Sequence, residues 1–193
     1  KYFNSKELIE ETKVKAITDA HEPGSVMKPI SLAITLKANK LLQSQGKPTI
    51  FNPDEKVDTS NGRFPGRSKP ITDTHFHHYL DMKLGFQKSS NIYFARQIQK
   101  VVQQFGDSWY RHELELFGFG KKTGVELPGE SAGLLPRIGK NHPNGRPEWS
   151  VPTPFSLAIG YNIQTTSLQM LQAIAVFANG GKLVSPTLIR KIV

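Results

Sequence analysis

The sequence predicts an α+β fold, with mainly the helical part of that fold inside these 193 residues. Three observations support this prediction. Apolar residues recur at helical spacing in several separate segments, which are bounded by capping residues, Pro or Gly. Long stretches rich in Gly and Pro separate these segments, and few runs alternate as strands do. A hydrophobic fraction of 37% is globular, and the length suits one domain or a large piece of one.

The first helices are expected in residues 4–19 and 25–40. Asn4 is followed three positions later by Glu7, which is a capping pattern for a short helix. Pro23 and Gly24 then interrupt the chain. The segment after this break carries apolar residues typical of a buried helix, namely Met27, Ile30, Leu32, Ile34, Leu36 and Leu41.

Residues 46–74 are dense in Gly and Pro, so we expect a loop region with short strands at most. The clearest helix spans residues 90–105 and ends at Gly106. Asp107 is a good cap for a second helix through Phe117. The apolar face of the first of these two helices consists of Phe94, Ile98, Val101, Val102 and Phe105.

Residues 118–154 return to turn chemistry. Thr166 and Gln169 then form a Thr-x-x-Gln capping box that begins another helix, which Gly180 and Gly181 end. The final run, residues 188–193, is typical of the start of a strand. The expected apolar face of the helix consists of Leu168, Leu171, Ala175 and Ala178.

Composition excludes several classes of function. The chain has no cysteine, which rules out disulfides, cysteine nucleophiles and thiolate metal sites. The net charge of +9 invites a nucleic-acid interpretation, but the Lys and Arg residues are scattered and no binding motif accompanies them. A solvated basic surface facing anionic polymer or lipid head groups explains the charge better. No apolar run reaches the roughly 20 residues of a membrane helix, and the sequence does not begin with Met, so we expect a piece of a longer protein.

Residues 72–78 offer a candidate metal site, because they hold one Asp and three His. Alternation would place His75 and His77 on one side of a strand, as a zinc site requires. No fourth ligand is evident nearby, so an exposed polar strand or loop is the favoured interpretation. We therefore predict neither a metal site nor a cofactor.

The reactive chemistry is concentrated in residues 22–28, which read Glu-Pro-Gly-Ser-Val-Met-Lys. A serine hydroxyl needs a nearby base to act as a nucleophile at neutral pH. Lys28 follows Ser25 by three residues, on the same helix face, and burial would lower its pKa toward the working pH. The helix N-terminus would favour negative charge developing beside Ser25. Ser-x-x-Lys is thus a sensible acyl-transfer pair, although the tetrapeptide alone is also typical of an ordinary cap.

A second serine pattern, residues 89–91, directly precedes the clearest helix and reads Ser-Ser-Asn. On a tight turn, the Ser89 hydroxyl could relay a proton between the lysine and a leaving amine, and the Asn91 carboxamide could hold a substrate peptide group. Taken alone, the triplet is better explained as a helix cap.

Together the two patterns resemble the penicillin-binding proteins, and more specifically the class B, monofunctional transpeptidases. Further stretches agree with the family, in the family's order along almost the whole chain. The Phe-Gly-Phe-Gly segment and the residues after it resemble the division-type enzymes in particular. The agreeing stretches are residues 117–120 with 123–130, 158–162 with 166–169, and 178–181 with 185–186.

The resemblance implies a serine D,D-transpeptidase with the fold shared by penicillin-binding proteins and serine β-lactamases. Ser25 would attack the penultimate D-alanine carbonyl of a stem peptide, release D-alanine and pass the acyl group to an amine on a neighbouring peptide. Lys28 would take and return protons, Ser89 would shuttle one to the leaving group, and Asn91 would orient the peptide. β-Lactams would leave Ser25 as a stable ester.

The same resemblance implies the partners and the location. The partners would be stem peptides, β-lactams and other proteins of cell-wall synthesis or division, with no nucleic acid. The parent protein would be anchored in the bacterial cytoplasmic membrane outside this segment, with this domain on the extracytoplasmic side.

The family also needs a Lys-Thr/Ser-Gly triplet on a strand. Residues 122–124 have these letters but lie in a turn-rich stretch, so we reject them. In the family the active-site triplet follows the Thr-x-Leu-Gln helix, and this sequence ends at Val193 before reaching it. We expect residues 1–193 to be a partial transpeptidase domain that lacks most of the antiparallel sheet and is incomplete for catalysis alone.

Two other functions remain open. A serine β-lactamase or β-lactam sensor would share Ser-x-x-Lys but differ in the fate of the acyl-enzyme. A non-catalytic structural fragment of the division machinery would need no chemistry at all. The stretches at residues 117–120 and 166–169 favour the transpeptidase over both.

Overall fold

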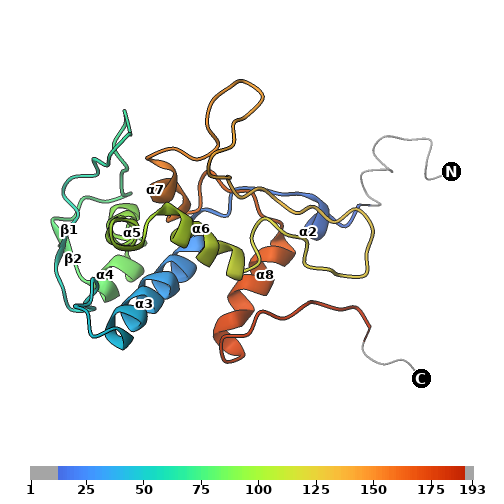
Figure 1. Ribbon diagram of the computed structural model, residues 1–193, viewed down its shortest axis with the longest axis horizontal. Coiled ribbons are helices and arrows are strands. Elements are labelled where there is room, and N and C mark those ends of the chain that lie inside the picture. Colours follow the sequence, from blue (N-terminus) through green and yellow to red (C-terminus); the bar gives the residue numbers. More distant parts are fainter. Residues whose placement is uncertain (1–12, 190–193) are drawn as a thin grey trace. The chain divides into compact units, whose positions relative to one another are not determined.

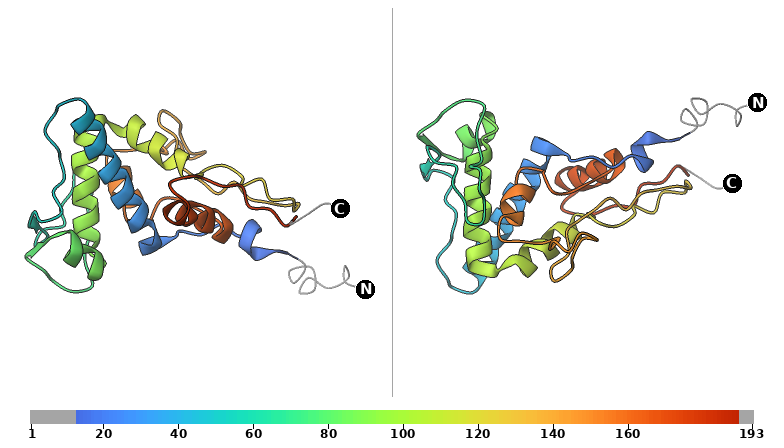
Figure 2. Two further views of the ribbon diagram at one scale, coloured as in Figure 1. Left: turned by 90° about the horizontal axis from the view of Figure 1, so that it is seen from below. Right: turned by 90° about the horizontal axis from the view of Figure 1, so that it is seen from above.

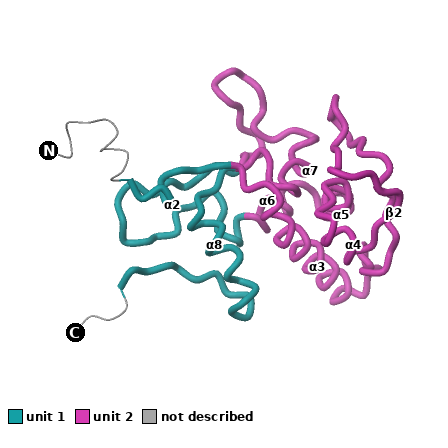
Figure 3. The backbone as a smooth tube through the Cα atoms, turned by 180° about the vertical axis from the view of Figure 1, so that it is seen from behind, with its two compact units in different colours: residues 1–21, 115–135, 164–193 teal, residues 22–114, 136–163 magenta. Residues whose placement is uncertain are grey.

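The structure is a computed structural model that describes residues 13–189 (Figure 1). The chain divides into two compact units. Unit 1 consists of residues 1–21, 115–135 and 164–193, and unit 2 consists of residues 22–114 and 136–163 (Figure 3). None of the helices within residues 13–189 is long and apolar enough to span a membrane.

The core of unit 2 is built on three helices, α3 (Lys28–Ser44), α5 (Asn91–Phe105) and α7 (Thr153–Leu157). Helix α5 packs against both α3 and α7 (Figure 2). Of its predicted apolar face, Phe94, Ile98 and Val101 are buried, whereas Val102 and Phe105 are half-buried. Each fully buried side chain of this size stabilises the fold by roughly 1.5–3 kcal/mol. The fully buried aliphatic residues of α3 and α5 are Ile30, Ile34, Ala38, Leu42, Ala95, Ile98 and Val101.

Shorter elements complete unit 2. A 3-10 turn, η1 (Gly24–Met27), leads into α3, and α4 (Met82–Gln87) precedes α5. Strands β1 (Val57–Asp58) and β2 (Tyr79–Leu80) form an antiparallel pair in which Val57 faces Leu80. Helix α6 (Asp107–Leu116) follows α5, and its last two residues belong to unit 1. The described residues thus hold many helices and one small sheet, in agreement with the predicted helical part of an α+β fold.

Unit 1 contains α2 (Lys15–Thr18), α8 (Ser167–Ala175) and a final 3-10 turn, η2 (Val176–Ala178). Helices α2 and α8 are in contact. The predicted capping box at the start of α8 is confirmed, since Thr166 accepts a hydrogen bond from the N–H of Gln169 and the Gln169 side chain accepts one from the N–H of Thr166. The amide of Gln169 also donates to the carbonyls of Lys121 (2.6 Å) and Ala132 (2.8 Å), so this cap holds the adjoining loop.

Several sequence expectations were wrong in detail. Ser25 lies in η1, one turn before α3, rather than inside the α-helix, and α3 runs on to Ser44. On α3, Leu36 is 45% exposed, although its position predicted burial. On α8 the predicted apolar face is also wrong, because Leu171 is 64% exposed. The buried side chains of α8 are instead Gln169, Met170, Gln172 and Ala173. Polar groups bury there because the two glutamines donate to backbone carbonyls.

Two helices were not predicted, α4 and α7. Each is only five or six residues long, too short to show a helical period. Of the helix expected in residues 4–19, only α2 lies within the described residues. The strand expected in residues 188–193 falls mostly outside them.

Candidate active site

The nucleophile candidate is presented to solvent by a tight turn. Gly24 has a φ of +57°, a conformation that L side chains rarely adopt, and it starts the 3-10 turn that carries Ser25. Ser25 is exposed, whereas Lys28 is only 3% exposed. The turn therefore places a hydroxyl at the surface directly above a buried amine.

Three polar groups converge at this turn. The Nζ atom of Lys28 lies 3.0 Å from Ser25 Oγ and 2.8 Å from Ser89 Oγ, and it donates to both. It also donates a short hydrogen bond to the carbonyl oxygen of Ser89. The Ser89 hydroxyl in turn donates to Ser25 Oγ over 3.2 Å. The two serines and the lysine thus form a closed hydrogen-bonded triangle.

Burial sets the protonation of the lysine. Desolvation lowers the pKa of Lys28 from 10.5 to about 8, against a smaller opposing effect from the negative charge of Asp73. The amine also lies 5.9 Å from the centre of the Phe94 ring, which favours its charged form. Near neutral pH a useful fraction of Lys28 is therefore the neutral amine, which is able to act as a base.

The backbone at Ser89 is in the left-handed region, with φ at +51°. This conformation is uncommon for a residue other than glycine and costs on the order of 1–3 kcal/mol. Ser89 lies in the turn between α4 and α5. With this backbone conformation, both its carbonyl oxygen and its hydroxyl oxygen accept hydrogen bonds from Lys28. The strain is therefore located at the residue that closes the triangle.

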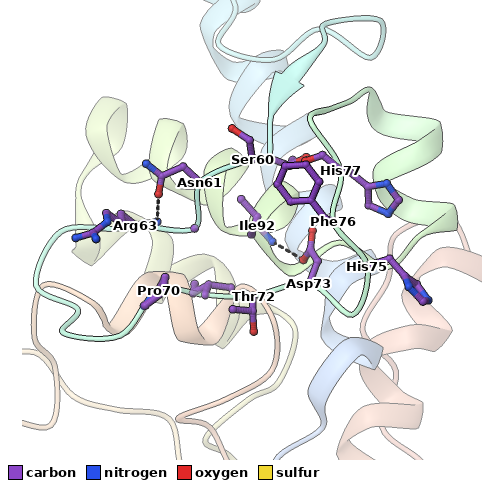
Figure 4. Close-up of a pocket in the computed structure, with 13 residues that line it drawn as sticks. Ser60, Asn61, Arg63, Pro70, Thr72, Asp73, His75, Phe76, His77 and Ile92 are labelled. Carbon is purple, nitrogen blue, oxygen red and sulfur yellow. Dashed lines mark hydrogen bonds between the residues drawn. The ribbon is translucent and has the colours of Figure 1, made fainter.

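Asp73 fixes the Ser-Ser-Asn turn from the side of the neighbouring loop. Its carboxylate accepts from the Ser90 hydroxyl (2.5 Å), the N–H of Asn91 (2.5 Å) and the N–H of Ile92 (3.1 Å). Figure 4 shows this carboxylate turned toward Ile92. Asp73 therefore satisfies the free N–H groups at the start of α5, and its charge lies close to Lys28.

Asn91 occupies the first turn of α5, and its Nδ2 atom donates to the carbonyl of Thr72 (2.9 Å). No hydrogen bond joins its side chain to Ser25, Lys28 or Ser89 within the described chain. Of the four residues singled out in the sequence, three are thus brought into direct contact, and the fourth is adjacent but engaged elsewhere.

Residues 158–162 contact the turn that carries Ser25, residues 22–27, here named the nucleophile turn. The N–H of Gly24 donates to the carbonyl of Gly160 (3.0 Å), and the N–H of Asn162 donates to the carboxylate of Glu22 (2.7 Å). Gly160 has a φ of +79°, and a Cβ atom there would lie 2.0 Å from the Gly24 carbonyl oxygen. The Ser31 hydroxyl of α3 adds a bond to the carbonyl of Ala158 (2.8 Å). This packing requires glycine at position 160.

Comparison with known proteins decides the family. A family model described as the penicillin binding protein transpeptidase domain matches residues 1–193. The chain belongs to this family. The family predicted from the sequence motifs is thereby confirmed.

Named relatives agree with the family. The chain is 31% identical over 176 residues to the probable peptidoglycan D,D-transpeptidase PbpC of Pseudomonas aeruginosa, covering 91% of this chain and 27% of that protein. It is 31% identical over 180 residues to the penicillin-binding protein PbpB of Mycobacterium tuberculosis, covering 92% and 23%. The chain therefore spans about a quarter of the length of these two relatives, 27% and 23%.

Solved structures confirm the expected fold. The transpeptidase domain of Burkholderia pseudomallei penicillin-binding protein 3 matches with a TM-score of 0.71 and 26% identity, over 94% of this chain and 48% of that one. Penicillin-binding protein 3 of Mycobacterium tuberculosis, solved in complex with aztreonam, matches with a TM-score of 0.70 and 33% identity, over 90% and 34%.

Residues 122–124 read Lys-Thr-Gly, but their turn-rich surroundings predicted that they are not the active-site triplet of the family. The structure confirms that they do not lie on a strand. Thr123 is 5% exposed, and its hydroxyl and N–H both donate to the carboxylate of Glu130 (2.5 and 2.6 Å). The N–H of Gly124 adds a third bond to Glu130 (3.1 Å). The hydroxyl is thus committed to a structural turn.

The side chains of the candidate metal site, residues 72–78, do not come together as a group that could hold an ion. Within residues 13–189, no three His, Asp or Glu side chains lie close enough to hold an ion. Asp73, one of the candidate ligands, is bonded to the start of α5, and Figure 4 shows the rings of His75 and His77 apart from it. The sequence offered Asp73 only as one member of a metal candidate that was not favoured, and its bonds to the start of α5 were not predicted. No local signal indicated them, because Ser90 is 17 residues further along the chain.

Proposed function

We propose that the protein containing this chain is a peptidoglycan D,D-transpeptidase that is acylated on Ser25. The observation that carries the proposal is the triangle formed by Ser25, Lys28 and Ser89. The family and the named relatives support the same reaction class. The proposed substrates are peptidoglycan stem peptides, and the proposed inhibitors are β-lactams.

Hydrogen-bond accounting at Lys28 indicates how the serine is activated. A protonated lysine has three N–H donors, and three acceptors surround it. The neutral amine keeps two donors and gains one lone pair. Because the Ser89 carbonyl can only accept a hydrogen bond, one N–H of the neutral Lys28 amine must still donate to it. The lone pair of the amine therefore faces one of the two hydroxyls. Ser25 is then able to donate its proton to Lys28 while Lys28 donates to both oxygens of Ser89.

Acylation follows from this arrangement. The Oγ atom of Ser25 attacks the penultimate D-alanine carbonyl as its proton moves to Lys28, and the bond to the terminal D-alanine breaks. The leaving nitrogen receives a proton from the Ser89 hydroxyl, which is 2.8 Å from Lys28 and is reprotonated by it. An acceptor amine then attacks the ester and returns a proton to Ser25. General acid–base help of this kind contributes typically 10²–10⁴-fold to a rate.

The role of Asn91 belongs to this proposal. Its Nδ2 atom is engaged with Thr72, so we assign its carboxamide oxygen to the peptide N–H of the substrate. The location we propose is the extracytoplasmic side of the bacterial cytoplasmic membrane, where stem peptides are cross-linked. A role in division, suggested by residues 117–130, stays a prediction.

Fluorescent penicillin added to the full-length protein tests the proposal. We expect stoichiometric, long-lived labelling that disappears in Ser25→Ala and persists in Ser44→Ala, a change at the far end of α3. Rapid loss of the label would indicate a β-lactamase instead. Absence of any label in the parent protein would leave only a structural role.

A further inference from the structure

Residues 137–148 form an ordered hairpin whose closing bonds are strong. The guanidinium of Arg137 binds Glu148 through Nη2–Oε1 (2.6 Å) and Nε–Oε2 (3.0 Å), and the N–H of Arg137 adds a third bond (3.0 Å). Such two-pronged pairing fixes geometry as well as charge. It also holds the pKa of Glu148 at about 2. In Figure 3 the hairpin projects from unit 2 as a loop.

The rest of the hairpin is also hydrogen-bonded. The N–H of His142 donates to the carbonyl of Arg146 (2.8 Å), and the N–H of Gly145 returns to His142 (2.9 Å). Toward its base, the N–H of Glu148 donates to the carbonyl of Lys140 (2.8 Å). The side chains on this arm are therefore presented from a defined backbone and not from an unstructured loop.

One side of the hairpin borders a cavity of about 540 Å³, here named the hairpin cavity. Its volume lies within the range of roughly 300–1,000 Å³ found for small-molecule sites. The wall is mostly polar, and its polar lining residues are His142, Asn144, Arg146, Glu148, Ser150 and Asn162. A peptide fragment with several polar groups fits such a lining better than an apolar ligand does.

The charge of this lining is positive. Glu148 is neutralised by Arg137, which binds both of its oxygens. Within residues 13–189, the guanidinium of Arg146 makes no hydrogen bond and no ion pair, and His142 lies close enough to act electrostatically on Glu148. An unpaired guanidinium recognises a carboxylate through two parallel hydrogen bonds. The cavity therefore favours an anionic group.

The cavity is tied to the nucleophile turn through one residue. Asn162 lines the cavity, and its N–H donates to Glu22 over 2.7 Å. Glu22 precedes Ser25 by three residues, a reach of at most about 11 Å of extended chain. Two residues before Asn162, the carbonyl of Gly160 accepts from the N–H of Gly24, so this edge of the cavity adjoins the segment that carries Ser25.

We propose that the hairpin cavity is the subsite for the acyl acceptor, a second stem peptide whose carboxylate is bound by Arg146. The inference rests on the proposed function. In the step it serves, the acceptor amine nitrogen attacks the ester carbonyl of acyl-Ser25, and the bond from that carbonyl to Ser25 Oγ breaks. An amide forms, and the proton lost by the amine passes to Ser25 Oγ, so no other reactant is needed.

The test uses the full-length protein, a thioester stem-peptide analogue as acyl donor and a stem tripeptide ending in a diamino acid as acceptor. The acceptor is supplied with its carboxylates free or amidated, and chromatography gives the ratio of cross-linked to hydrolysed product. The parent protein is expected to prefer the free carboxylates by about tenfold, as one charge-assisted bidentate pair implies. In Arg146→Ala this preference falls to near one.

The matched control is Lys140→Ala, which removes an exposed cation of the same hairpin that does not line the cavity. It keeps the tenfold preference. Both variants are labelled by fluorescent penicillin at the parent rate, because acylation does not involve the acceptor. An unchanged preference in Arg146→Ala, or equal use of both acceptors by the parent protein, overturns the subsite. Failure of the parent protein to be labelled at all overturns the proposed function itself.

Discussion

The amine of Lys28 lies 3.0 Å from the hydroxyl of Ser25, although the lysine is 3% exposed and the serine faces solvent. The 3-10 turn makes this possible, because it carries Ser25 outward and ends where α3 begins, at Lys28, whose side chain points inward. The consequence is a candidate base, Lys28, whose pKa is lowered by burial, and a candidate nucleophile, Ser25, that is exposed to solvent.

The rate of acylation is expected to follow the neutral form of Lys28. Because burial lowers the pKa of Lys28 to about 8, the neutral amine is scarce at pH 6 and dominant above about pH 8. Labelling by fluorescent penicillin at subsaturating concentration should therefore rise about tenfold per pH unit from pH 6 toward pH 8 and then level off. Lys28→Met should lose at least about 100-fold on the plateau above pH 8 and show no such rise with pH. A profile that is flat across this range contradicts the assignment of the base.

Asp73→Asn is expected to change both the pH profile and the stability. The negative charge of Asp73 raises the pKa of Lys28, so its removal should move the midpoint of the acylation profile to lower pH. The variant also weakens three hydrogen bonds at the start of α5, which should cost about 1–2 kcal/mol of unfolding free energy. Asp54→Asn, a change at an exposed carboxylate, is the control for both measurements. A midpoint that moves to higher pH is the result that would refute this account.

Two substitutions, Ser89→Ala and Ser89→Gly, distinguish the effect of the Ser89 hydroxyl on acylation from the effect of its left-handed backbone on stability. Both remove the Oγ atom that contacts Lys28 and Ser25, so both should slow acylation by about 10–100-fold. Only glycine adopts a φ of +51° without strain, so the glycine variant should be more stable than the alanine variant by about 1 kcal/mol. Thermal denaturation and labelling rates on the same samples decide the matter. Equal stabilities would show that the left-handed backbone is not strained.

Gly160→Ala is expected to disturb the nucleophile turn. Its new Cβ atom would meet the Gly24 carbonyl oxygen at 2.0 Å, so the segment must move away from Ser25. We expect a loss of roughly 2–3 kcal/mol and a fall in acylation rate. Gly46→Ala is the matched control, since Gly46 has a φ of +66° but nothing within 4 Å of an added Cβ. It should cost about 1 kcal/mol and leave labelling unchanged. Equal effects of the two variants would rule out a role for this packing in the site.

Sequence reasoning worked where the signal is local. The period of α5, its stop at Gly106 and the capping box of α8 all follow from residues within a few positions of each other, and all are present. The same reasoning failed for the buried faces of α3 and α8, because the direction of burial depends on which neighbour covers a helix. Leu171 is exposed while Gln169 and Gln172 are buried, since the glutamines have backbone partners to bind.

The sequence by itself determined the candidate nucleophile and base, because Ser25 and Lys28 are three residues apart and any helical turn brings them together. It also determined the family, through the order of short motifs. Only the tertiary structure decided that Ser89 closes the triangle and that Asp73 binds the N–H groups at the start of α5. It alone showed that Asn162 joins the nucleophile turn to the hairpin. These contacts join residues far apart in the chain, and their geometry depends on how α3, α5 and the loops pack, which no local pattern encodes.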